Sequence, residues 1–187
     1  MNTEPLSLSN WKAFETLFGE RGACGGCWCM AYRMHRKEFV AGQQAKTHKQ
    51  AMKKLVRAGK PIGLIGFING QPAGWCALAP REDLVRFEKS RVHKRIDDLP
   101  VWSISCLFVD KKFRNRGVSL EMIKAAIAYA TRNNIQVIEA YPVNPAKGRL
   151  PDAFAWTGLL KTYLEAGFEV VDRTSKARPM VRWYSGH

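Results

Sequence analysis

The sequence predicts a single mixed α/β domain over residues 1–187, and three observations lead to that fold class. The length of 187 residues is that of one domain, long enough to bury a core without disulfides or a structural metal. Hydrophobic residues make up 46% and charged residues 25%, as in ordinary globular proteins. After Trp102, apolar strands alternate with helices, which requires at least one parallel crossover connection.

Helical patterns dominate the first third of the chain. A short capped helix is expected directly after Asn10, with four apolar residues on one face, namely Trp11, Phe14, Leu17 and Phe18. Residues 27–34 are expected to form a strand or the end of a loop. Residues 36–58 predict one long helix, closed by Gly59.

A β-hairpin is expected next. Residues 62–68 and 73–79 have the composition of strands, and Asn69-Gly70 between them is the strongest short-range hairpin signal. Residues 81–99 are charged and have no clear secondary-structure pattern.

The second half of the chain gives the clearest alternation. Residues 102–109 predict a buried strand and residues 119–133 a helix with one apolar stripe. The later elements are expected to be a strand at 136–143, a loop at 144–152, a helix at 154–166 and two strands at 168–172 and 180–184.

Charge and cysteine content narrow the class of protein. Lys and Arg number 30 and Asp and Glu 16, a net charge of +14 that favours polyanionic partners. No apolar run approaches the roughly 20 residues that span a bilayer, so no membrane partner is expected. The first ten residues lack a secretory pattern, and five cysteines are an odd number for a disulfide framework, so a cytoplasmic location is expected.

The segment 107–119 has the pattern of an anion-binding turn. A strand ends at Val109, a basic turn follows, and Gly117 precedes a helix. The helix N-terminus offers free N–H groups and partial positive charge, and glycine lets the backbone approach a ligand closely. The pattern therefore predicts a phosphate or pyrophosphate site. It matches neither the P-loop nor the dinucleotide-binding glycine motif.

The motif Arg114-x-x-Gly117-x-Ser119 resembles the pyrophosphate-binding signature of the GNAT acetyl-CoA-dependent N-acetyltransferases, although Ser119 stands where Gly or Ala is usual. Asn144 after a strand, and a Tyr-x-x-x-Gly-Phe ending at residues 163–168, also resemble that family. The stretch GGCWC near the N-terminus is similar to a cysteine-rich element in a subset of it. The resemblance implies a central, mostly antiparallel mixed sheet, helices on both faces and a splayed strand pair for acetyl-CoA.

The same resemblance implies site residues and partners. Tyr163 would protonate the departing thiolate, and Glu139 and the Cys27–Cys29 loop would contact the acceptor. The expected acetyl-CoA contacts are Leu107, Phe108, Val109, Arg114, Asn115, Arg116, Gly117, Val118, Ser119 and Asn144. Acetyl-CoA would serve as co-substrate, the acceptor would be a small-molecule or peptide amine, and a homodimer stays open. No metal is expected.

Two questions stay open in the sequence. The cysteines Cys24, Cys27 and Cys29 fit a metal site that lacks a fourth ligand, a reactive thiol, a tight loop lining the acceptor pocket with Trp28 as a wall, or simple close packing. The group that acts as general base is also undecided, and the candidates are Glu139, Asp83, Glu82 and a water chain.

Two other function classes compete with the acetyltransferase. A GNAT-like fold could bind acyl-CoA as a sensor without turnover. A basic nucleic-acid-binding module is disfavoured, because the tryptophans fall in apolar elements and no known RNA- or DNA-binding motif is present.

Overall fold

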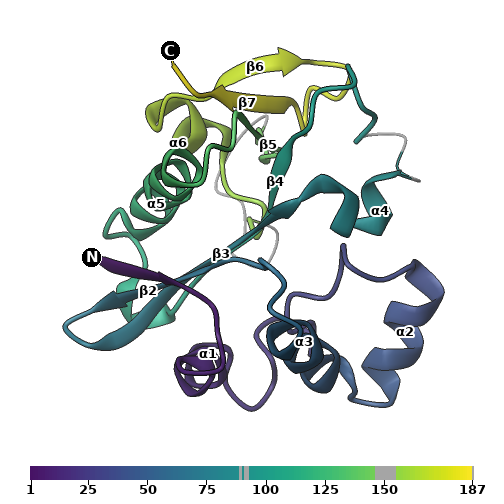
Figure 1. Cartoon of the computed structure of the whole chain (residues 1–187), viewed down its shortest axis with the longest axis vertical. Coiled ribbons are helices and arrows are strands. Elements are labelled where there is room, and N and C mark those ends of the chain that lie inside the picture. The colour runs from purple at the N-terminus through teal and green to yellow at the C-terminus, as the bar shows by residue number, and fades with distance from the viewer. Residues whose placement is uncertain (89, 91–92, 146–154, 187) are drawn as a thin grey trace.

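The computed structural model describes residues 1–88, 90, 93–145 and 155–186. Its centre is a seven-stranded sheet in the order β1-β2-β3-β4-β5-β7-β6 (Figure 1). Neighbouring strands are antiparallel except β4 and β5, which are parallel. The strands are β1 (Asn2–Pro5), β2 (Leu64–Ile68), β3 (Gln71–Pro80), β4 (Trp102–Val109), β5 (Val137–Ala140), β6 (Glu169–Asp172) and β7 (Met180–Tyr184). The predicted fold class, mixed and mostly antiparallel, is confirmed.

Helices cover both faces of this sheet, as Figure 1 shows. One face packs against α5 and α6, and the other against α1 and α3, with α2 beyond them. The helices are α1 (Trp11–Phe18), α2 (Arg36–Gln44), α3 (His48–Arg57), α4 (Val85–Glu88), α5 (Val118–Arg132) and α6 (Leu160–Glu165). Two single 3₁₀ turns, η1 (Arg81–Asp83) and η2 (Lys111–Phe113), follow β3 and β4.

Strand β3 separates two hydrophobic cores. Trp75 and Ala77 face α1 and α3, while Cys76 and Leu78 face α5, and all four are fully buried or nearly so. Successive side chains of a strand point to opposite faces, so a strand covered on both sides must be apolar at every position. This explains the unbroken apolar sequence of β3 from Ala73 to Ala79, while Gln71 at its start is exposed.

A bulge in β4 separates it from β5. Ala77 pairs with Cys106 but Leu78 pairs with Ile104, so Ser105 is an extra residue without a partner on β3. The parallel pairing with β5 ends at Ile104 and Ala140, while β4 continues to Val109. The two strands therefore diverge, and the last part of β4 offers a free edge.

Several sequence predictions need correction. The helix expected over 36–58 is two helices, because the chain breaks at Lys46, whose φ is +55°. Residues 27–34, expected to be a strand or the end of a loop, form turns, so the strand alternative is wrong. The helix expected from 154 begins only at Leu160; Phe154, like most of the loop expected at 144–152, lies outside the described residues. Strand β1 was not expected at all.

No helix in the described part of the chain has the length and apolarity needed to cross a bilayer.

Candidate functional site

The free edge of β4 is the first component of the site. Leu107, Phe108 and Val109 lie beyond the last pair with β5, so their backbone groups on that side are open to other partners. One partner is already present: the Leu107 N–H donates to the Trp156 carbonyl at 2.7 Å. An extended ligand can pair with such an edge as an added strand.

The turn after β4 is the second component. Asn115 and Gly117 both have left-handed φ angles, +58° and +76°, which bend the chain into the start of α5. Gly117 is the N-cap residue and supplies no side-chain cap, so the first-turn N–H groups remain available for an anion. A Cβ built at Gly117 meets nothing within 4 Å. The turn is therefore open on the side where a phosphate group would approach.

Side chains fix the shape of this turn. The Lys112 backbone N–H donates to Asp110 Oδ1 at 2.8 Å, and Arg114 Nε donates to the Val109 carbonyl at 3.1 Å. Lys111, Lys112 and Arg116 are exposed, so their charges are free to attract an anion. The predicted anion-binding turn thus combines an open helix N-terminus with exposed positive charges, and we call it the cradle.

A cavity of about 990 Å³ joins the strand edge to the cradle. We call it the groove. Its lining includes Leu107–Val109, Arg114, Asn115 and Gly117–Ser119, together with Ala155, Trp156, Gly158, Leu159, Thr162 and Glu165. All predicted acetyl-CoA contacts except Arg116 and Asn144 therefore line one space.

The other predicted residues lie outside the groove lining. The Asn144 side chain donates to the Lys176 carbonyl at 3.2 Å, so a contact with a cofactor arm would have to exchange that bond. Tyr163 is completely buried, and its hydroxyl donates to the Thr157 carbonyl at 3.2 Å. Burial raises the pKa of Tyr163 well above its ordinary value, which keeps the phenol protonated.

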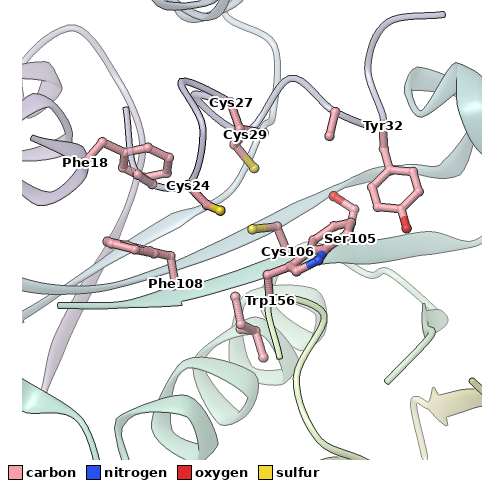
Figure 2. A pocket seen from close by; sticks show the side chains of 12 residues that line it. Phe18, Cys24, Cys27, Cys29, Tyr32, Ser105, Cys106, Phe108 and Trp156 are labelled. Atoms are coloured by element: carbon pink, nitrogen blue, oxygen red, sulfur yellow. The ribbon is translucent and has the colours of Figure 1, made fainter. Parts of the chain in front are cut away.

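A second, smaller cavity of about 160 Å³ lies where the loop after α1 crosses β4. We call it the pocket, and Figure 2 shows it from close by. It shares Phe18, Ala23, Cys24, Leu107, Phe108 and Trp156 with the groove, so the two spaces adjoin. Its remaining lining residues are Cys27, Cys29, Ala31, Tyr32, Ser105 and Cys106. The sequence did not mark Phe18, Tyr32, Ser105, Cys106 or Trp156 as residues of one pocket, since they are far apart along the chain.

The cysteine-rich loop forms one wall of the pocket through unusual backbone angles. Ala23, Trp28 and Cys29 all have positive φ, which is uncommon for residues with a side chain. Trp28 turns away from the pocket and packs against Phe18, with ring centroids 5.7 Å apart. Cys29 turns inward, and its Sγ accepts a hydrogen bond from Trp75 Nε1 at 3.2 Å.

The thiols of the pocket differ in acidity. A hydrogen bond from the Cys106 thiol, aided by the charge of Arg33, lowers the pKa of Cys29. Burial raises the pKa of Cys27 to about 11, so this thiol is neutral. In the described part of the chain, no group of three or more potential ligands could hold a metal ion. All five cysteines are free thiols.

Glu139, predicted to contact the acceptor, has a structural role instead. It is fully buried and lines neither cavity. One carboxylate oxygen accepts from Arg81 and from the Tyr141 hydroxyl, and the other accepts from Arg182 Nη2 at 3.1 Å. Both of its oxygens are thus committed to buried partners.

The two other carboxylates considered as bases also lie outside both cavities. Glu82 accepts a hydrogen bond from Arg95 at 2.8 Å, which holds the pKa of that carboxyl below its ordinary value. Asp83 is 3.9 Å from Lys60 Nζ. Neither is placed to receive a proton from a molecule in the pocket.

The family is decided by a sequence comparison. A family model described as the acetyltransferase (GNAT) family matches residues 28–149. The chain belongs to the GNAT acetyltransferase family. The resemblance carried by the Arg114–Ser119 motif is confirmed, whereas the cysteine-rich element is not addressed by this match. A search of curated proteins gives no match.

Solved GNAT structures share the fold at low sequence identity. The PaiA N-acetyltransferase from Thermoplasma acidophilum, crystallised with coenzyme A, is 14% identical with a TM-score of 0.54, covering 98% of each chain. A GNAT family acetyltransferase from Brucella melitensis, in complex with acetyl-CoA, is 10% identical with a TM-score of 0.51, covering 100% of this chain and 88% of that one. A ribosomal-protein-alanine N-acetyltransferase from Brucella melitensis is 13% identical with a TM-score of 0.52, covering 98% and 99%. These likenesses concern the fold.

Proposed function

We propose that this GNAT protein is an N-acetyltransferase that moves an acetyl group from acetyl-CoA to a primary amine. The observation that carries the proposal is the continuity of three features: the open β4 edge, the cradle and the pocket. Leu107 and Phe108 line both the groove and the pocket, so a ligand lying along β4 would present its end to the pocket.

The groove suits acetyl-CoA in shape and charge. Its volume of about 990 Å³ is at the upper end for ligand sites, as a large cofactor requires. The free N–H groups at the start of α5, with Lys111, Lys112 and Arg114, would hold the pyrophosphate. The backbone of Leu107–Val109 would pair with the pantetheine arm. The bound molecule supplies an activated acetyl thioester.

The chain contributes position and polarisation to the transfer. The Leu107 N–H points to the free side of β4 and would stabilise negative charge on the carbonyl oxygen, after giving up its bond to Trp156. Tyr163, kept protonated by burial, is the proposed proton donor to the leaving sulfur; because it lines neither cavity, its hydroxyl would have to leave the Thr157 carbonyl and turn toward the groove. Holding the two reactants side by side supplies the remaining acceleration.

Thermal shift with acetyl-CoA tests the cradle. A ligand at 100 times its Kd stabilises the folded protein by about 2.7 kcal/mol, so millimolar acetyl-CoA is expected to raise the melting temperature by several degrees. Gly117→Glu should abolish the shift, because it places a negative charge in the cradle. No shift for the unmodified protein would refute the proposal.

Gly70→Glu is the matched control for that variant. Gly70 has a φ of +75° and Gly117 a φ of +76°, and a Cβ at either one meets nothing within 4 Å. Both substitutions therefore strain the backbone equally, but only Gly117 lines the groove. Gly70→Glu is expected to keep the full acetyl-CoA shift.

Thiol release in the presence of a broad amine panel separates an enzyme from an acyl-CoA sensor. Steady production of free CoA that depends on the amine is expected. Tyr163→Phe should lower kcat about a hundredfold or more while leaving the acetyl-CoA thermal shift unchanged. Undiminished turnover in Tyr163→Phe would remove Tyr163 from the mechanism.

A further inference from the structure

The pocket has the size and surface of a site for one apolar ring. Its volume is about 160 Å³. A dry apolar protein cavity of about 150 Å³ holds a benzene molecule. Figure 2 shows aromatic side chains and cysteine sulfur atoms around the space. Sulfur makes favourable contacts with aromatic rings, so a thiol-lined pocket suits such a ligand.

The pocket lining offers an ammonium group aromatic faces but no counter-charge. Among its lining residues, all of them in the described part of the chain, there is no Asp, Glu or His. The charges just behind the wall are positive. Arg86 Nη1 donates to the Ala31 carbonyl at 2.9 Å, and its guanidinium lies 5.7 Å from the centre of the Tyr32 ring. The charge of Arg178 also acts on Tyr32.

Cys29 does not supply the negative charge that the pocket lining lacks. Any negative charge on its sulfur is matched by Arg33, which lies close enough to lower the pKa of this thiol. The same sulfur already accepts hydrogen bonds from Trp75 and Cys106. An ammonium entering the pocket would therefore lose its hydration without gaining a free counter-charge.

A base for deprotonating an ammonium is also missing from the pocket wall. Glu139, Glu82 and Asp83 line neither cavity. His93 stands behind Tyr32, with ring centroids 5.7 Å apart, and burial lowers its pKa to about 4, which makes it a weak base. An acceptor that is already uncharged at neutral pH needs neither a counter-charge nor a base to deprotonate it before the attack.

We propose that the acceptor of this enzyme is a small aromatic amine, uncharged at neutral pH. This inference rests on the proposed function. The amine nitrogen forms a bond to the acetyl carbon, the carbon–sulfur bond breaks, and the proton lost by nitrogen ends on the CoA sulfur. One arylamine and one acetyl-CoA give one N-aryl acetamide and one CoA thiol.

Two isomeric amines test the proposal. 4-Methylaniline and benzylamine have the same formula and nearly the same size, but at neutral pH the first is uncharged and the second is an ammonium. An alkyl ammonium titrates near pH 10, so only about one molecule in a thousand is neutral at pH 7. Thiol release with saturating acetyl-CoA is expected to give a kcat/KM at least tenfold higher for 4-methylaniline.

A substitution that fills the pocket tests the location. Ala31 lines the pocket but not the groove, so Ala31→Leu should raise the KM for 4-methylaniline at least tenfold and leave the acetyl-CoA thermal shift intact. Ala58→Leu adds the same atoms at the exposed end of α3 and should change neither quantity. An unaltered KM in Ala31→Leu would refute the placement.

The outcomes separate this inference from the proposed function. If acetyl-CoA gives no thermal shift, the proposed function fails. If acetyl-CoA binds and benzylamine or another charged amine is acetylated faster than 4-methylaniline, the proposed function stands and the inference is refuted. Binding of acetyl-CoA with no acetylation of 4-methylaniline refutes the inference as well.

Discussion

At Gly22 the loop after α1 passes so close to the Trp28 indole that no side chain fits. A Cβ there would lie 2.5 Å from Trp28 Cδ1, and the φ of Gly22 is +63°. We expect Gly22→Ala to reduce the free energy of unfolding by about 1–3 kcal/mol beyond the cost of the backbone angle, because it overpacks a buried indole. Urea-induced unfolding measures this loss.

Gly19→Ala isolates the backbone contribution. Gly19 has a φ of +64°, but a Cβ there meets nothing within 4 Å. Its ψ is −179°, a backbone region that residues with a Cβ rarely adopt, so this variant should lose only the roughly 1–3 kcal/mol that such an angle costs. Equal losses in the two variants would show that contact with Trp28 does not require glycine at position 22.

His93 makes stability depend on pH. Burial lowers its pKa from 6.5 to about 4, so between these values the unfolded chain binds more protons than the folded one. Stability is therefore complete above pH 6.5 and is lost as the pH falls toward 4, by about 3 kcal/mol in total. His93→Gln should have a flatter stability profile over this range in urea titrations. A profile parallel to that of the unmodified protein would contradict the assignment.

At the scale of elements, the break between α2 and α3 allows the buried side chain of His48 to contact two backbone carbonyl groups. The His48 ring is 1% exposed, and its two nitrogens lie 2.9 Å from the Gly26 carbonyl oxygen and 3.0 Å from that of Phe39. A continuous helix would not bring these groups together. Residues 36–58 were predicted as one helix, which is correct for their helical character and wrong for the break, because Gly26 belongs to another loop and nothing local encodes the interruption.

The break also predicts a stabilising substitution. Lys46 is exposed and has a φ of +55°, an angle that glycine adopts without strain. We expect Lys46→Gly to increase the free energy of unfolding by about 1 kcal/mol. Lys37→Gly, within α2, should decrease it by a similar amount. Loss of stability in both variants would argue against the left-handed turn.

Elements that depend on neighbouring residues could be predicted from the sequence, and elements that depend on residues far along the chain could not. The hairpin turn at Asn69-Gly70 has two left-handed residues, φ +50° and +75°, as its sequence predicts, and β4 has the predicted bounds. Strand β1 was missed because it is short, mostly exposed and paired with β2, about sixty residues away. Residues 155–159 were taken as helix, although their conformation depends on pairing with Leu107 and Val143.

At the scale of the whole molecule, the net charge of +14 should speed and strengthen acetyl-CoA binding. Replacing Lys111 and Lys112 by alanine is expected to weaken binding about threefold to tenfold and to reduce its salt dependence. The same change at Lys53 and Lys54 on α3 removes equal charge away from the groove and should alter the Kd less than twofold. Titration calorimetry at two salt concentrations makes the comparison.

The two parts of the site differ in how much the sequence reveals. The cradle occupies consecutive residues, so its sequence motif and the shape of its turn can be predicted together, while its binding of phosphate stays a prediction. The pocket combines the loop after α1, the bulged part of β4 and Trp156. Only the cysteine loop was predicted to contribute, because nothing local marks Tyr32 or Trp156 as its neighbours.

The bulge at Ser105 has a consequence for how this protein can evolve. Cys106 and Phe108 reach the pocket side only because one extra residue shifts the alternation of β4. Losing or gaining one residue there would turn these side chains to the opposite face and move the cradle with them. Point substitutions at 106 and 108 leave the backbone unchanged. New acceptor specificities should therefore arise by replacement of side chains, while the length of β4 stays fixed across descendants.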